Sequence, residues 1–295
     1  MPRIPTIIDA PDGTIRGVNI KRLAEIPYFL LGNTPNNIIS MLANQSSEPV
    51  SMSISGEGPA QLFHLAAERL APCKIMIQIQ DGQGVRALMN KACHVDTIFG
   101  NYNANNRPYT LPEALYLDEQ RQVIITATDI SGADNTFRPS LDAQRLLTRL
   151  ADHDLSRARA KMEKRQYLSL PSFYTLDNGS SVIAANGTNV ETITVGQESH
   201  FDLVQITAVS TGVFDMEIVN ISTGESMTDG PLAQSFPISS NLCSSASAGF
   251  PFKFHEPLFV ELKSKLQITL TDRSGAPNTV FVTFGGSNLA DRMWQ

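Results

Sequence analysis

One element of the sequence concentrates groups that could bind a ligand, and it occurs twice. It has the form TD-x-SGA-x-NT and spans residues 128–136 and 271–279. Its carboxylate and hydroxyl oxygens are suitable ligands for Ca²⁺, and they could also bind a sugar. The same residue types build turns, because Asp and Ser accept hydrogen bonds from turn amides and Gly adopts a positive φ. Such turns are common, so we expect a structural turn between two strands. The residues assigned to it are Asp129, Ser131, Gly132, Asn135, Asp272, Ser274, Gly275 and Asn278.

Catalytic and metal chemistry find little support in the remaining sequence. The five histidines are scattered, and Cys93-His94-x-Asp96 is the one local group of potential ligands. Neighbouring strand residues point to opposite faces, and this spacing matches no common zinc or catalytic pattern. No nucleophile elbow, phosphate-binding loop or dinucleotide fingerprint is present. A glycosidase-type carboxylate pair remains open, but 29 acidic residues offer no way to single one out. We therefore expect no enzyme activity, no metal and no cofactor.

Two polar loops at corresponding places in the chain are candidate interaction surfaces. Residues 100–107 are rich in Asn, whereas residues 241–249 are rich in Ser and Ala. Loops often carry binding residues on a rigid scaffold, but they also vary freely without any function. The sequence leaves both interpretations open. The candidate residues are Asn101, Tyr102, Asn103, Asn105, Asn106, Arg107, Asn241, Ser244, Ser245 and Ser247.

A basic run at residues 157–165 stands out in a chain that is acidic overall. It could contact an acidic partner or nucleic acid, although a solvated helix face is the favoured interpretation. Its residues are Arg157, Arg159, Lys161, Lys164 and Arg165.

The composition excludes several classes of protein. The chain has 295 residues and a net charge of −6, so it lacks the electrostatic footprint of a general nucleic-acid binder. No apolar stretch approaches the ~20 residues that a membrane span needs, and the first residues lack the apolar core of a signal peptide. The three cysteines are widely spaced and predict neither a disulfide framework nor a zinc site. The length allows one large domain or two modest ones.

An internal repeat favours two domains. Residues 113–136 and 256–279 are identical at 11 of 24 positions at a constant offset of 143. The similarity continues upstream with small gaps, so the copies run over about residues 27–136 and 171–279. Such self-similarity is typical of a repeated structural unit.

Each copy has the pattern of a β-sandwich, and helical pattern is confined to the joints. Apolar residues alternate with polar ones in short runs such as 74–80, 122–128 and 265–271, with Gly, Asn, Asp and Pro clusters between them. Residues 140–166 are rich in Leu, Ala, Arg and Lys, which favours a helix. We expect a mainly β fold, with two tandem homologous β-sandwich (jelly-roll-like) domains joined by a helical connector. The expected parts are an N-terminal arm (1–26), a first repeat (27–139), the connector (140–170), a second repeat (171–287) and a short C-terminal helix (288–295).

This tandem strand pattern, and the segment at residues 257–286 in particular, resembles virion structural proteins of tailed bacteriophages and related double-stranded DNA viruses. The resemblance implies a β-sandwich module of a capsid, decoration or neck protein. The halves of double-jelly-roll capsid proteins usually show little sequence likeness, whereas these halves are plainly alike. This departure favours an accessory role over that of the major capsid protein.

The resemblance implies a non-enzymatic protein of the virion that is made in the cytoplasm of the host cell. Its expected partners are copies of itself and other virion proteins, without membrane and without nucleic acid. Two equivalent modules on one chain would let a trimer form a pseudo-sixfold ring. The alternative is a tandem carbohydrate-binding or adhesion module, whose expected sign is exposed aromatic residues in the tip loops. Those loops offer only Tyr102.

Overall fold

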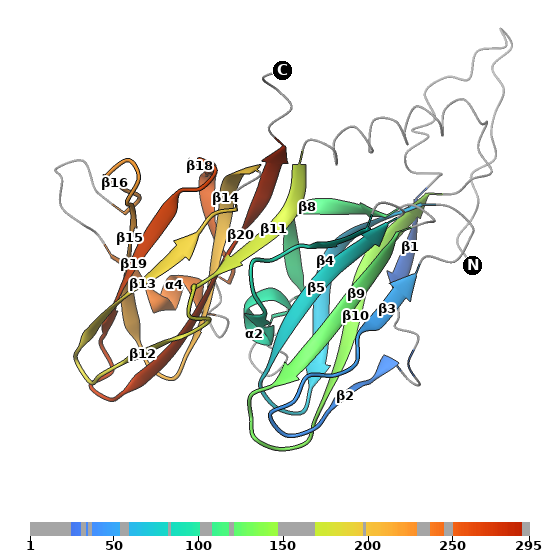
Figure 1. Ribbon diagram of the computed structural model, residues 1–295, viewed down its shortest axis with the longest axis horizontal. Helices are drawn as coiled ribbons and strands as arrows, with labels where there is room; N and C mark the ends of the chain where they lie inside the picture. Colours follow the sequence, from blue (N-terminus) through green and yellow to red (C-terminus); the bar gives the residue numbers. More distant parts are fainter. Residues whose placement is uncertain are drawn as a thin grey trace, which may run out of the picture.

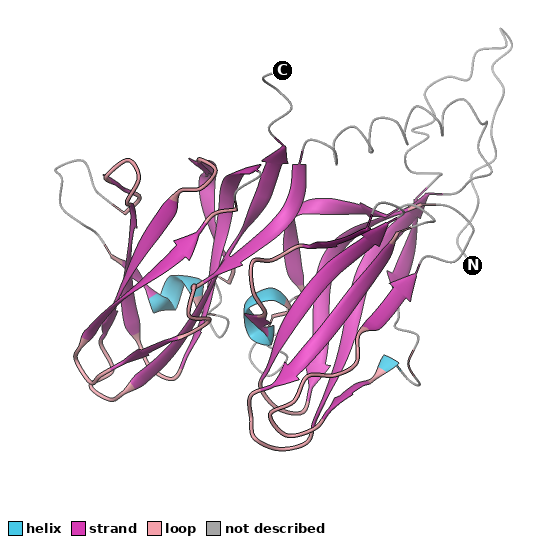
Figure 2. Cartoon of the chain, in the orientation of Figure 1, coloured by secondary structure: helices cyan, strands magenta, loops and turns pink. Residues whose placement is uncertain are grey.

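The computed structural model describes residues 25–30, 34, 37–53, 59–81, 84–100, 108–117, 121–146, 169–196, 199–228, 237–244 and 250–290. Within these ranges the chain is mainly β, with two one-turn helices (Figure 2). The strands form two groups that lie side by side (Figure 1). This observation confirms the expected fold class at the level of a mainly β protein.

The first half contains two antiparallel sheets. Its elements are β1 (Glu25–Leu30), β2 (Ile39–Met41), β3 (Val50–Ser53), β4 (Ala60–Arg69), β5 (Cys73–Asp81), β6 (Gly84–Ala87), β7 (Cys93–His94), α2 (Val95–Ile98), β8 (Tyr109–Leu117), β9 (Gln122–Asp129) and β10 (Asn135–Leu146). One sheet has the order β1-β10-β4-β8, with β2 also paired to β10. The other has the order β3-β9-β5-β6, with β7 also paired to β5.

The second half repeats this arrangement. Its elements are β11 (Ser169–Thr175), β12 (Ser181–Ile183), β13 (Thr188–Thr194), β14 (Ser199–Ser210), β15 (Phe214–Asn220), β16 (Glu225–Ser226), β17 (Ile238–Ser239), α4 (Ser240–Cys243), β18 (Phe252–Val260), β19 (Lys265–Asp272) and β20 (Asn278–Ala290). The sheet orders are β11-β20-β14-β18, with β12 on β20, and β13-β19-β15-β16, with β17 on β15.

The two halves correspond residue by residue over much of their length. An offset of 143 superimposes β8 on β18, β9 on β19 and the first residue of β10 on that of β20. A register shift falls between Leu62 and His64 in β4 and between Leu203 and Gln205 in β14. The two halves are therefore alike in strand pairing as well as in sequence.

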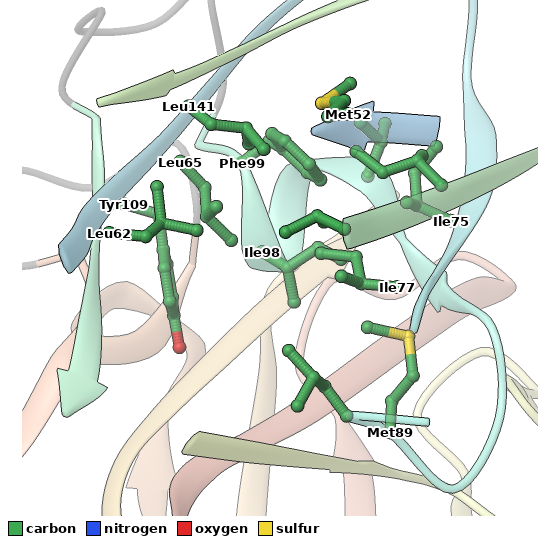
Figure 3. Close-up of a cluster of buried hydrophobic side chains, with 14 of the residues drawn as sticks. Met52, Leu62, Leu65, Ile75, Ile77, Met89, Ile98, Phe99, Tyr109 and Leu141 are labelled. Carbon is green, nitrogen blue, oxygen red and sulfur yellow. The ribbon is translucent and has the colours of Figure 1, made fainter. Parts of the chain in front are cut away.

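Each half encloses a hydrophobic core because alternate strand residues turn inward. In the first half, one cluster of buried residues includes Met52 and Ile75 from one sheet and Leu62 and Leu141 from the other (Figure 3). In the second half, β15 buries every second residue from Phe214 onward. Burial of this apolar surface is the main favourable contribution to folding.

The structure corrects the expected helix at the start of the connector. Residues 140–146 continue strand β10, and Leu141 and Ala143 are buried in the sheet. Burial on a pleated surface here overrides the local helix propensity of Leu, Ala and Arg. Residues 147–168 lie outside the described ranges.

The ends of the expected parts also differ from the prediction. Residues 288–290 belong to strand β20 rather than to a C-terminal helix, because they pair with β11 and β14. Strand β11 begins at Ser169, inside the expected connector. Residues 1–24 and 291–295 lie outside the described ranges, so the expectations for them stay predictions.

Candidate functional site

In the first half, the repeated turn motif is organised around the carboxylate of Asp129. Its Oδ1 accepts hydrogen bonds from the Ser131 amide (3.1 Å), the Ser131 hydroxyl (2.6 Å) and the Asn135 side chain (3.1 Å). Its Oδ2 accepts from the amides of Gly132 (3.0 Å) and Asn44 (2.9 Å). The carboxylate thus ties the turn to a neighbouring loop.

In the second half, Asp272 has the same set of partners. Its Oδ1 accepts from the Ser274 amide (3.1 Å), the Ser274 hydroxyl (2.7 Å) and the Asn278 side chain (3.4 Å). Its Oδ2 accepts from the amides of Gly275 (3.0 Å) and Asn186 (2.9 Å). Gly275 has a φ of 74°, which L-residues with side chains rarely adopt.

These hydrogen bonds hold both carboxylates in the charged form. The hydroxyl of Ser131, with help from backbone amides, lowers the pKa of Asp129 well below its usual value, while desolvation opposes the shift. Ser274 does the same for Asp272. Each carboxylate oxygen already accepts at least two hydrogen bonds from the protein, an arrangement that suits a turn. Among the described residues, no cluster of three His, Cys, Asp or Glu side chains could hold a metal ion.

The Cys93-His94-x-Asp96 group is divided among three environments. Cys93 is fully buried, and desolvation raises the pKa of its thiol to about 12. The His94 ring caps α2 by accepting from the Asp96 amide, and burial lowers its pKa to about 4. The Asp96 carboxylate pairs with Arg69 through two hydrogen bonds of 2.8 and 2.5 Å. The three groups therefore do not converge on a common ligand.

Most of the candidate interaction residues lie outside the described ranges. Asn241 is exposed in α4, and its amide donates to the Ser239 hydroxyl. The amide of Ser244 donates to the Ser240 carbonyl. The residues outside the described ranges are Asn101, Tyr102, Asn103, Asn105, Asn106, Arg107, Ser245 and Ser247, together with the basic run Arg157, Arg159, Lys161, Lys164 and Arg165. Their proposed roles stay predictions.

A further polar constellation lies between the two halves, and it begins at a strand edge. Residues 88–90 of the first half run alongside β11 through a parallel bridge between Met89 and Phe173. The Phe173 amide donates to the Leu88 carbonyl (2.7 Å), and the Asn90 amide donates to the Phe173 carbonyl (3.2 Å). The Asn90 side chain pairs with both backbone groups of Thr175. The first half thus extends a sheet of the second half.

Helix α2 packs on the outer face of that sheet through hydroxyl groups. Thr97 Oγ1 lies 2.7 Å from Thr283 Oγ1, and Thr207 Oγ1 donates to the Thr97 carbonyl (2.8 Å). All three threonines are at most 1% exposed. Buried hydroxyls that satisfy one another fix the relative position of the two surfaces, since an unpaired one would be costly.

Strand β8 covers the adjoining part of the same face. Gln205 Nε2 donates to the Tyr109 hydroxyl (2.5 Å) and to the Thr110 carbonyl (3.1 Å). A Cβ at Gly285 would lie 2.5 Å from the Tyr109 hydroxyl, so glycine allows the close approach. Farther along, the Ser287 hydroxyl donates to Glu113 (3.3 Å). We call Gln205, Thr207, Thr283, Gly285 and Ser287 the covered face.

Phe173 inserts into the first half. Its side chain is 0% exposed and belongs to the first hydrophobic core, whereas the neighbouring Tyr174 belongs to the second. A wholly apolar cavity of about 10 Å³ adjoins Phe173, Leu88 and Leu111. This volume is too small for an organic ligand. The contact between the halves is thus a packed interface.

Sequence reasoning did not single out the residues of this interface. Gln205, Thr97 and Phe173 meet partners that are 83 or more positions away, which periodicity does not reveal. A difference between the copies could have pointed to the site. Asp142-Ala143 in the first copy is replaced by Gly285-Gly286 in the second.

Comparison with known proteins gives no family assignment. No family model and no curated protein matches the sequence. Among solved structures, the chain is similar to one from Sulfolobus Turreted Icosahedral Virus, with 12% identity and a TM-score of 0.25 over 88% of this chain and 61% of that chain. It is also similar to a β-porphyranase of Bacteroides plebeius, with 8% identity and a TM-score of 0.19 over 88% of this chain and 38% of that one.

A tandem CBM22 domain of Paenibacillus barcinonensis Xyn10C gives 7% identity and a TM-score of 0.19 over 90% of this chain and 99% of that one. TM-scores this low carry no functional argument. The chain spans about three fifths of the length of the viral protein. Within the described residues, no helix is long and apolar enough to cross a membrane.

Proposed function

We propose that the chain is a non-enzymatic structural component of a virus particle and that it assembles through protein–protein contacts. The observation that carries this proposal is the interface between the halves. There, Phe173 packs into the core of the first half, and hydrogen-bonded side chains on the covered face join the two β-sandwiches. The polar groups between the halves thus serve to join two modules.

The topology of each half supports the proposal. We number eight strands of the first half in chain order, taking β1 and β2 as the first strand and omitting β7. The sheets then have the orders 1-8-3-6 and 2-7-4-5. The second half has the same orders. These orders are those expected of a jelly roll, a fold that builds viral capsid proteins as well as lectins, and they support the proposal of two jelly-roll domains. We infer that the two halves arose by duplication.

The likeness of the two halves favours an accessory protein, such as a decoration or neck component, over the major capsid protein. Its partners would be copies of itself and other virion proteins, and it would reside in the virion after synthesis in the host cytoplasm. Two similar modules can occupy similar positions in a symmetric assembly, for example as a trimer with a pseudo-sixfold ring.

Native mass spectrometry and cryo-electron microscopy of the purified full-length protein test this proposal. We expect closed oligomers or particle-like assemblies whose abundance rises with concentration. A monodisperse monomer at every concentration and salt condition would contradict the proposal.

A second candidate function, carbohydrate binding, is favoured by one exposed aromatic residue. The Phe259 side chain is 56% exposed and stacks on His200, with ring centroids 5.1 Å apart. Flat aromatic faces on β-sandwiches can stack on sugar rings. A glycan array with the wild type and Phe259→Ala tests this candidate, with Val182→Ala as a control at an exposed residue that has no ring. Glycan binding that Phe259→Ala alone abolishes would support this function over the structural one.

A further inference from the structure

We propose that one copy of the chain docks on the next by repeating, between chains, the contact that joins the two halves within a chain. Helix α4 and strand β18 of one copy cover the sheet β1-β10-β4-β8 of the next. This inference rests on the proposed function, and it names the two surfaces that carry self-assembly.

The first surface is the first-half counterpart of the covered face. The strand register makes His64 and Asp142 equivalent to Gln205 and Gly285. Ser140 and Ala66 are likewise equivalent to Thr283 and Thr207, and Gln144 is equivalent to Ser287. We call His64, Ala66, Ser140, Asp142 and Gln144 the open face.

The covered and open faces differ sharply in exposure. Gln205 and Thr283 are 0% exposed beneath α2 and β8. The side chains of His64 and Asp142 are 38% and 42% exposed. The same position of the same sheet is therefore a completed interface in one half and an accessible surface in the other.

The second surface consists of the equivalents of the covering elements. Leu242 occupies the same place after the helix cap in α4 as Thr97 does in α2. Thr97 is 0% exposed, whereas Leu242 is 49% exposed. In β18, Lys253 is the equivalent of Thr110 and is exposed. The chain thus carries both an open face and an accessible copy of the elements that cover such a face.

The pairing of residues 88–90 with the edge strand β11 also has counterparts in the repeat. In the first half, the Leu88 amide donates to the Ile77 carbonyl, and the chain then runs along β11. In the second half, the Met227 amide donates to the Ile218 carbonyl. The equivalent of β11 is β1, which lies at the edge of its sheet. Met227 and Thr228 thus correspond to Leu88 and Met89, which run beside β11, and an edge strand such as β1 is a template for pairing.

The side chains on the two surfaces are complementary. Superposition on the internal contact places Leu242 over Ala66 and Ser140. It also brings the backbone of Lys253 next to His64 and Asp142, since Thr110 meets Gln205 through its carbonyl; the His64 nitrogen and the Asp142 oxygen are 2.9 Å apart. The equivalent of Tyr109 is Phe252, which lacks the hydroxyl that a Cβ at Gly285 would approach. In this arrangement the apolar Leu242 faces two small residues, and the cationic Lys253 lies near the carboxylate of Asp142. This complementarity favours a second copy of the chain as the occupant.

The contact is heterologous, because each copy uses a different surface toward each neighbour. Such contacts generate a ring if the rotation closes and a filament if it does not. At the copy-to-copy contact, His64 and Asp142 take the places of the uncharged Gln205 and Gly285, so we expect assembly to depend on salt.

Cross-linking of the full-length protein tests the inference. Gln144→Cys and Glu256→Cys place thiols at the equivalents of Ser287 and Glu113, whose side chains are 3.3 Å apart. A short bismaleimide should link the double variant into chains of two or more copies, whereas each single variant stays uncross-linked. The native Cys73, Cys93 and Cys243 are 0% exposed and contribute little background. Glu113→Cys with Ser287→Cys is the matched control, in which the link forms within one chain.

A charge exchange gives a second readout. Lys253→Glu should weaken association at low salt by about tenfold, and the added change Asp142→Lys should restore most of the loss. Oligomers that form without these cross-links and without this charge dependence would overturn the inference and leave the proposed function standing. A chain that stays monomeric throughout would overturn both.

Discussion

Gln205 of the second half and Tyr109 of the first are joined by a hydrogen bond of 2.5 Å between the side-chain amide and the phenol hydroxyl. Both residues are 0% exposed, and burial raises the pKa of Tyr109 further above its usual value. The tyrosine therefore stays neutral, and its hydroxyl remains available as a hydrogen-bonding group. This bond crosses the boundary between two sandwiches, so the halves are positioned by specific polar pairing as well as by apolar packing.

The close approach at this boundary depends on Gly285. A Cβ at this position would lie 2.5 Å from the Tyr109 hydroxyl and 3.1 Å from Gln205 Cγ. We expect Gly285→Ala to lower the free energy of unfolding by about 1–3 kcal/mol, because the packed side chains must shift. Urea denaturation measures the effect. Tyr109→Phe removes the hydroxyl, so Gly285→Ala should cost less in that background. Equal costs in both backgrounds would contradict this account.

The threonine contact between α2 and the covered face predicts a matched pair of substitutions. Thr283→Val keeps the shape but removes the hydroxyl that pairs with Thr97 Oγ1, which keeps only its hydrogen bond to the His94 carbonyl. We expect a loss of about 1–2 kcal/mol in the free energy of unfolding. Thr271→Val removes a similar pair, in which Thr188 and Thr271 are 3.1 Å apart at an exposed site. Chemical denaturation should show a much smaller loss there, since water replaces the partner.

The strands were largely predictable from the sequence, because apolar and polar residues alternate wherever only one face of a strand is buried. Runs such as 265–271 in β19 owe their pattern to the second core. Residues 140–146 were misassigned because their local composition favours a helix while the neighbouring strands β1 and β4 hold them in a sheet. Local propensity carries no information about those distant partners.

The interface was not predictable in the same way. Thr97 contacts Thr283, 186 positions later, and neither residue belongs to a recognisable motif. The repeat identified residues that both copies need for folding, such as Asp129 and Asp272. The contact within one chain involves residues at which the two copies differ. Gly285, which aligns with Asp142 when the two copies are compared, is one such position.

The two turn carboxylates predict a dependence of stability on pH. The pKa values of Asp129 and Asp272 are lowered in the folded protein, so the unfolded chain binds more protons in acid. Their stabilising contribution is complete above the unfolded-state pKa, near 4, and is lost as the pH falls toward the folded-state value. The urea concentration at the denaturation midpoint should therefore decrease as the pH is lowered from about 5 to about 2.

Replacing both carboxylates should flatten that part of the profile. Asp129→Asn with Asp272→Asn is expected to lower the midpoint at pH 7 and to reduce its slope below pH 5. Asp134→Asn is the control, because its carboxylate is exposed and accepts the Ala43 amide outside this network. An unchanged acid slope in the double variant would assign the pH dependence to other groups.

Phe173 should determine whether the two halves unfold together. It is a second-half residue whose side chain is buried in the first core, so its removal leaves a cavity at the joint. We expect Phe173→Ala to cost about 3–5 kcal/mol and to separate unfolding into two calorimetric transitions. Phe214→Ala makes the same chemical change inside the second core. That variant should lower stability by a similar amount while leaving the contact between the halves intact. Two transitions for Phe214→Ala and one for Phe173→Ala would show that residues other than Phe173 make the two halves unfold together.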